Sequence, residues 1–192
     1  GVANAVVKIT GVPGALTPGK GLLNQVQCQF VPHVQAVTAG STMVITSEDS
    51  VLHNAHAFNE DGSTAFNIAV PIAGMELTAT LKKPGVIKLR CDAGHTWMNG
   101  YIVVTDTPYY AVTDADGNFK INGVPDGDYQ LEVWQEWIGI QKQPVSAKPG
   151  DDEVVGRRAL GASISGRVEG PDGKAITQAS VNATWKTPSG AS

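Results

Sequence analysis

Residues 86–104 limit the possible folds of this chain more than any other stretch, and they read Val-Ile-Lys-Leu-Arg-Cys-Asp-Ala-Gly-His-Thr-Trp-Met-Asn-Gly-Tyr-Ile-Val-Val. Apolar and polar residues alternate at both ends of this stretch, which predicts a β-strand on each side of a short loop. The loop carries Cys91, His95 and Met98. A thiolate, an imidazole and a thioether are therefore brought within reach of one ion.

This set of side chains favours copper. Thiolate and thioether are soft donors, imidazole suits copper and zinc, and Met is not among the usual zinc ligands. Two His and one Cys around a metal with a weak axial Met form the blue-copper arrangement of electron-transfer proteins. The loop supplies one His, so a second has to come from elsewhere. Our candidate is His53, which follows a strand-like run and a turn at 47–50.

With these residues the chain resembles a cupredoxin of the plastocyanin and amicyanin type. The resemblance covers about the middle half of the chain, and its matching segments are Phe30-Val-Pro-His33, Ala39-Gly-Ser-Thr42, His53-Asn54 and residues 91–104. It implies that His53, Cys91, His95 and Met98 bind one copper ion per chain in a Greek-key β-sandwich. It also implies electron transfer without catalysis, a buried His53, a His95 near the surface, and an Asn54 that ties the two ligand segments together by hydrogen bonds.

Two features of the loop depart from related copper loops. Three residues separate Cys91 from His95, whereas amicyanin-like loops have two there. The Cys, His and Met spacing equals the second half of the binuclear copper loop of cytochrome oxidase. That site needs another Cys four residues before Cys91, where this chain has Ile87. We therefore expect a mononuclear site.

Composition limits the remaining function classes. With 22 Gly, 11 Pro and many Val and Thr runs among 192 residues, the chain is expected to be all-β. The net charge of −4, without a basic stripe, disfavours nucleic acid and anionic lipid as partners. No run of about 18 apolar residues is present, so no membrane span is expected. The resemblance implies a periplasmic or extracellular location and a redox protein as partner, such as a cytochrome or a membrane complex. Since the chain starts at Gly1 without a signal core, either a signal has been removed or the chain is part of a longer one.

The sequence changes in character from Tyr109 onward. Residues 111–133 resemble the second half of a carboxypeptidase-regulatory-like or transthyretin-like sandwich, which is Ig-like, with strands predicted at Phe119 and at Tyr129. Residues 164–181 resemble the first half of such a module. Either the N-terminal strand belongs to this second sandwich and a further module opens near 164, which we favour, or the tail folds back to complete it. The predicted parts are an N-terminal strand and loop (1–24), a copper domain (25–106), a second-sandwich segment (107–147), a linker (148–162) and a further module or completing strands (163–192).

Other readings of the histidines and cysteines stay open. A strand is predicted over residues 25–37, and on it Cys28 and His33, together with His56, offer a second metal site; ordinary packing and surface roles are the preferred interpretation. A second copper would make the chain an enzyme subunit, for example of a nitrite reductase. A third possibility is a structural, partner-binding sandwich in a surface protein or a multi-subunit assembly. Trp134 and Trp137 are predicted in the core or at a module interface.

Overall fold

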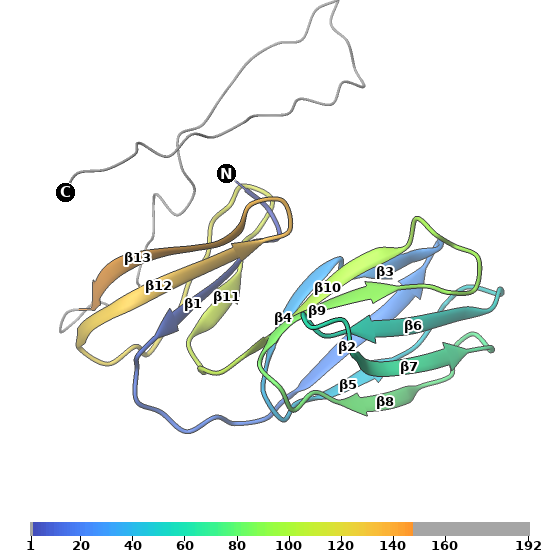
Figure 1. The fold of residues 1–192 in the computed structure, drawn as a ribbon, viewed down its shortest axis with the longest axis horizontal. Helices are drawn as coiled ribbons and strands as arrows, with labels where there is room; N and C mark the ends of the chain where they lie inside the picture. Colours follow the sequence, from blue (N-terminus) through green and yellow to red (C-terminus); the bar gives the residue numbers. More distant parts are fainter. Residues whose placement is uncertain (1, 148–192) are drawn as a thin grey trace, which may run out of the picture. The chain divides into compact units, whose positions relative to one another are not determined.

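Residues 2–147 are described by the structure, a computed structural model, and they form thirteen β-strands (Figure 1). None of these residues is helical, so this part of the chain has no helix that is long and apolar enough to cross a membrane. The predicted linker at 148–162 and the predicted module at 163–192 lie outside the described residues. The expected all-β class is confirmed.

The first sheet has five strands in the order β4-β10-β9-β6-β7. Its central strands β9 and β10 are antiparallel neighbours joined by the loop at 91–98, while β4 pairs with β10 in parallel. The bounds are β4 Val34–Thr38, β6 His53–Phe58, β7 Thr64–Val70, β9 Gly85–Arg90 and β10 Asn99–Thr105.

The second sheet has four strands in the order β3-β2-β5-β8. The pair β2 and β5 is parallel, and the other two pairs are antiparallel. The bounds are β2 Lys20–Val26, β3 Gln29–Val31, β5 Thr42–Ile45 and β8 Leu77–Thr80.

One hydrophobic core lies between these two sheets. Side chains alternate along β9, so Ile87 and Leu89 are buried while Lys88 and Arg90 are exposed on the opposite face. The core takes residues from both sheets, including Met43 and Ile45 of β5, as well as Cys91 and Met98 from the loop. The two sheets therefore form a sandwich, and the metal-ligand candidates sit at the end of its core.

The third sheet has four strands in the order β11-β1-β12-β13. The N-terminal strand β1 lies between β11 and β12 and is antiparallel to both. Ala5, Val7 and Ile9 share a buried cluster with Leu131, as the alternation predicted, and Val6 faces the other way. The bounds are β1 Val6–Thr10, β11 Tyr110–Val112, β12 Gly127–Gln135 and β13 Gly139–Ala147.

Two predicted strands are wrong. Residues 25–37 do not form one strand, because the chain reverses at Gln27 and Cys28, whose φ angles are 51° and 55°. Residues 20–24, grouped with the N-terminal strand and loop, are part of β2. The strand predicted at Phe119 is absent from the described residues; Phe119 instead packs from a loop against the buried cluster of the third sheet.

Candidate metal centre

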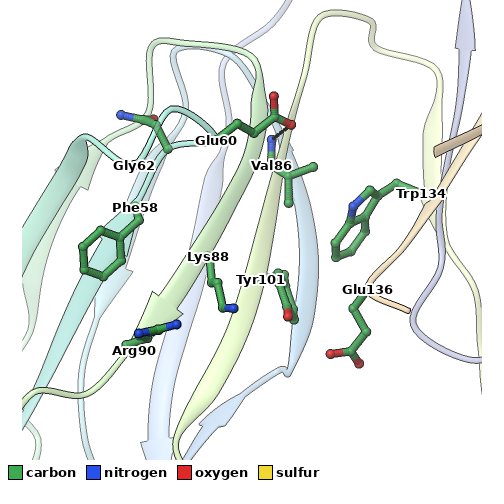
Figure 2. A pocket seen from close by; sticks show the side chains of 10 residues that line it. Phe58, Glu60, Gly62, Val86, Lys88, Arg90, Tyr101, Trp134 and Glu136 are labelled. Atoms are coloured by element: carbon green, nitrogen blue, oxygen red, sulfur yellow. Dashed lines mark hydrogen bonds between the residues drawn. The ribbon is translucent and has the colours of Figure 1, made fainter. Parts of the chain in front are cut away.

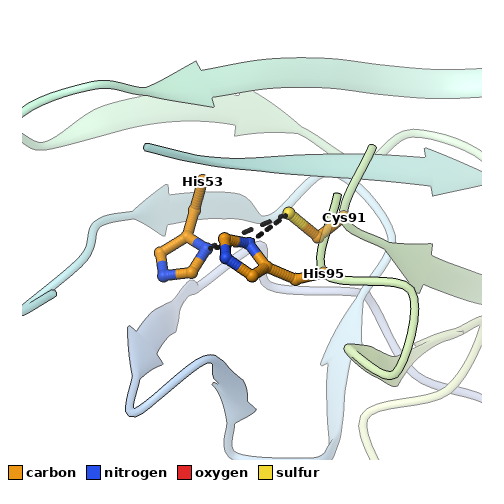
Figure 3. Close-up of side chains that lie close together, drawn as sticks. All are labelled: His53, Cys91 and His95. Atoms are coloured by element: carbon orange, nitrogen blue, oxygen red, sulfur yellow. Dashed lines mark hydrogen bonds between the residues drawn. The ribbon is translucent and has the colours of Figure 1, made fainter. Parts of the chain in front are cut away.

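Three of the four predicted ligands converge at one end of the first sandwich. Cys91 Sγ lies 3.9 Å from His53 Nδ1 and 3.7 Å from His95 Nδ1, and the two nitrogens are 3.1 Å apart (Figure 3). His53 and Cys91 are buried, and His95 is partly exposed, as expected for both histidines. This group can hold a metal ion.

The separations fit a single ion. Bonds from zinc to imidazole nitrogen and thiolate sulfur measure about 2.0–2.1 Å and 2.3 Å, so donors spread trigonally around such an ion lie about 3.5–3.8 Å apart. The two sulfur–nitrogen separations of 3.7 and 3.9 Å match this arrangement. The shorter 3.1 Å between the nitrogens corresponds to a narrower angle between the two imidazoles. No large movement is needed for all three donors to reach one ion.

Local structure places each donor. His53 is the first residue of β6, and Cys91 directly follows the last residue of β9. The chain then turns through Gly94, whose φ of +92° suits glycine, and the Met98 amide donates a 2.9 Å hydrogen bond to the His95 carbonyl. Met98 is buried in the same cluster as Cys91.

Asp49 fixes the orientation of His53, a role that was not among the predictions from the sequence. Its Oδ2 lies 2.8 Å from His53 Nε2, so Nε2 carries the proton and Nδ1 keeps its lone pair toward Cys91. The same carboxylate accepts the backbone amides of Gln27 and Cys28, each at 2.8 Å. Burial alone would raise the pKa of Asp49, but these hydrogen bonds outweigh it and hold the pKa below its ordinary value. The only local signal is an acid four residues before a candidate ligand.

Asn54 connects the two ligand segments, which confirms its predicted role. Its side-chain carbonyl accepts the backbone amide of Asp92, the residue after Cys91. Its amide group donates to Asn67 Oδ1 on the neighbouring strand at 2.8 Å. The start of β6 and the start of the loop are therefore held together independently of a metal ion.

Trp97 lies beside the exposed ligand. Its ring is edge-on to the His95 ring at 5.4 Å between centroids, and 61% of the residue is exposed. Its Nε1 donates to the Cys28 carbonyl at 3.2 Å. Leu52, next to His53 in the chain, is also exposed. The site thus meets the surface through one imidazole edge with apolar side chains nearby.

The remaining candidates do not gather into the proposed second site. His33 contacts Glu136 and the Asn99 carbonyl, whereas His56 contacts Asp92 and Thr64. Within residues 2–147, neither histidine belongs to a group of three potential metal ligands. Cys28 does belong to one, with Asp49 and His53. The Asp49 carboxylate in that group already accepts three hydrogen bonds, however, so it is committed to the turn and to His53.

The two tryptophans predicted in the core differ. Trp134 is buried and packs against Tyr101, with 5.1 Å between ring centroids, as predicted. Trp137 is 85% exposed at the β12–β13 turn, so it does not belong to the core of the described residues, and its place at a module interface stays a prediction.

Comparisons with known proteins found one family model and several solved structures. The model described as polysaccharide lyase family 4, domain II, matches residues 78–154, which is less than half of the chain. That match starts within β8, includes β9 and β10, and then covers β11, β12 and β13, which are three of the four strands of the third sheet. No curated protein matches the chain. The resemblance of residues 111–133 to a regulatory-like sandwich stays a prediction.

The solved structures include three copper proteins. A purple cupredoxin from Nitrosopumilus maritimus is 22% identical, with 44% of this chain and 99% of that chain covered at a TM-score of 0.39. Amicyanin from Paracoccus versutus is 15% identical, and the match covers 52% of this chain and 97% of that chain at a TM-score of 0.39. The copper-containing nitrite reductase from Thermus scotoductus is 23% identical, and the match covers 52% of this chain and 25% of that chain, also at a TM-score of 0.39. At such scores and identities these matches do not identify the function of this chain.

Proposed function

We propose that this chain would hold one copper ion through His53, Cys91, His95 and Met98, and that it transfers single electrons. The observation that carries the proposal is the triangle of two imidazole nitrogens and a buried thiol, with separations of 3.1, 3.7 and 3.9 Å. These three donors alone would suit zinc or copper. Met98, which is buried in the same hydrophobic core as Cys91, favours copper, because a thioether is a soft ligand.

Burial of the site favours electron transfer over catalysis. Catalytic metal sites keep a position open for substrate or water. Here His53, Cys91 and Met98 are all buried. The partly exposed His95 lies on the side of the site that faces the surface. When bound, copper supplies a one-electron couple. The chain holds the donors in place through Asp49 and Asn54, and Cys91 gives up its proton on binding.

Electrons would pass through the exposed edge of His95. Trp97, which lies beside His95, and the exposed Leu52, which precedes His53 in the chain, offer apolar surface on which a redox partner can dock. We infer a partner protein of the cytochrome type or a membrane complex, and a periplasmic or extracellular location. The third sheet, joined to the copper-binding sandwich in the same chain, suits a subunit of a larger assembly.

The test is a copper titration of the protein, followed by visible absorption and electron spin resonance of the oxidised form. We expect one copper per chain and an intense thiolate-to-copper band. Cys91→Ser should abolish the band, and Cys28→Ser, the matched control at the other cysteine, should retain it. A band that survives in Cys91→Ser, or a protein that takes up no copper, would refute the proposal.

The enzyme alternative has its own outcome in the same experiment. A second, catalytic copper would raise the stoichiometry to two and add a second resonance signal. His33→Gln and His56→Gln should then each reduce the count. In the mononuclear protein both variants bind one copper, because these histidines contact Glu136 and Asp92 rather than the site.

A further inference from the structure

A cavity of about 460 Å³ lies over the outer face of the first sheet, away from the metal ligands. Its walls combine aromatic and cationic side chains from β6, β9, β10 and β12 with two acids, Glu60 from the β6–β7 turn and Glu136 directly after β12 (Figure 2). The lining residues that matter here are Phe58, Lys88, Arg90, Tyr101, Trp134 and Glu136. A volume of several hundred cubic ångströms is typical of small-molecule sites.

Strand register sets aromatic rings on both sides of the cations. Phe58 of β6 and Tyr101 of β10 are both direct cross-strand partners of Lys88 on β9. Arg90 lies two residues further along β9, on the same face as Lys88. Trp134 packs against Tyr101 and extends that aromatic wall. The two cations therefore lie on a floor with aromatic side chains at either end, as Figure 2 shows.

The two acids at the rim are already engaged, whereas the cations are not. Glu60 accepts the backbone amide of Val86 at 3.0 Å, and Glu136 accepts a hydrogen bond from His33 at 2.9 Å. In the part of the chain that the structure describes, neither Lys88 nor Arg90 forms an ion pair or hydrogen bond with a side chain. The cavity thus offers two cations to a ligand.

Tyr101 adds a neutral hydroxyl to this wall. Burial raises the pKa of Tyr101, and the nearby Glu136 carboxylate raises it further, while Arg90 acts in the opposite direction. The hydroxyl consequently keeps its proton at neutral pH.

We propose that this cavity binds a small ring molecule that carries a carboxylate, with the carboxylate on Lys88 and Arg90 and the ring against Tyr101 and Trp134. The guanidinium group can hold both oxygens of a carboxylate, and the ammonium group adds a second charge. A single negative charge suits the site better than a phosphate dianion, since the Glu60 and Glu136 carboxylates also line the cavity and would repel a second negative charge more strongly. Sugar acids and aromatic acids share this chemistry. The proposal does not depend on the copper site.

The test is a titration of the isotope-labelled chain with small-molecule probes, in which the NMR signals of the Arg90 Nε–H and the Trp134 indole N–H report binding. The probes are glucuronate, benzoate and uncharged glucose. We expect one or both acids to shift these signals saturably, whereas glucose should not shift them. The acid that binds more tightly shows whether the site prefers a sugar acid or an aromatic acid. The double variant Lys88→Gln/Arg90→Gln should weaken binding at least tenfold.

A charge-matched control separates specific binding from general attraction. Lys20→Gln/Lys82→Gln removes two positive charges outside the cavity and should leave the affinity unchanged. All of these side chains are exposed or partly exposed, so both variants are expected to fold. The proposal is overturned if neither acid shifts the signals, if glucose binds as well as the acids, or if the two double variants lose affinity equally.

Discussion

At the scale of single residues, Asp49 links the metal centre to the fold. Its carboxylate accepts hydrogen bonds from the His53 ring Nε2–H and from the backbone amides of Gln27 and Cys28. Both turn residues have positive φ, a conformation for which hairpins usually employ Asn or Gly. The charge on Asp49 therefore stabilises a strained turn and selects the His53 tautomer at the same time.

Replacing Asp49 by Asn should weaken copper binding by about 10- to 100-fold, the usual effect of losing a carboxylate behind a metal-binding histidine. The Asn side-chain oxygen can still accept a hydrogen bond, but its NH₂ group would face an N–H donor that now bonds to the second carboxylate oxygen. Competition with a copper(I) chelator measures the affinity. Glu48→Gln is the matched control, because Glu48 is the adjacent acid and contacts Asn24 instead of His53. Equal affinities for the two variants would contradict this role for Asp49.

The ligand candidates that lie in one loop could be predicted from the sequence. Cys91, His95 and Met98 lie in one loop, so their proximity follows from two predicted strands. The contact between Asp49 and His53 could not be predicted in this way, because it depends on the turn at 27–28. That turn has no Gly, Pro or Asn, and the apolar alternation runs through it. Its stabilising group comes from another part of the chain.

At the scale of elements, β10 approaches β3 and the connection between β3 and β4 very closely at Gly100. A Cβ there would lie 3.0 Å from the His33 carbonyl oxygen and 3.3 Å from Phe30 Cβ. That carbonyl is fixed, since it accepts the Tyr101 amide at 2.8 Å. Gly100 is thus required for close contact between strands and not for an unusual backbone angle.

Gly100→Ala should destabilise the protein by about 1–3 kcal/mol, the usual cost of an overpacked core. The free energy of unfolding, measured by urea denaturation with circular dichroism, reports the effect. Gly19→Ala is the control, because its new methyl would meet only Ser41 Oγ at an ordinary 3.9 Å. A Gly100→Ala protein as stable as the control would show that the two strands can separate slightly at no cost.

Asp61 in the β6–β7 turn should make the free energy of unfolding depend on pH in the acidic range. Hydrogen bonds from Ser63, from its hydroxyl and its amide, together with Lys83, hold the pKa of Asp61 well below its usual range. A carboxyl group with a lowered pKa in the folded state stabilises the protein above its ordinary pKa of about 3.9 and loses that effect as pH falls further. Unfolding free energy should therefore drop below about pH 4 less steeply in Asp61→Asn than in the unmodified protein. Parallel slopes between pH 5 and pH 2.5 would contradict the prediction.

At the scale of the whole described chain, one apolar cluster joins the third sheet to the first. Val6 and Trp134 from the third sheet pack with Val34 and Val103 from the first, and all four are buried. A hydrogen bond of 2.9 Å between His33 Nε2 and Glu136 Oε1 adds a polar contact across the same boundary. The alternation of β1 predicted that Val6 faces away from its own cluster, but its partner surface could not be predicted, because it is formed by strands about 30 and 100 residues away.

Trp134 should therefore matter far more than its exposed neighbour Trp137. Trp134→Ala removes a large buried ring and should lower the free energy of unfolding by about 3–5 kcal/mol. Trp137→Ala, with a side chain in solvent, should change it by less than about 0.5 kcal/mol. Urea denaturation of both variants measures the difference, and the copper band of the folded Trp134→Ala protein should be unchanged because no metal ligand touches this cluster. Equal stability of the two variants would mean that the sheets are held together without Trp134, and a lost copper band would mean that the metal centre depends on the third sheet.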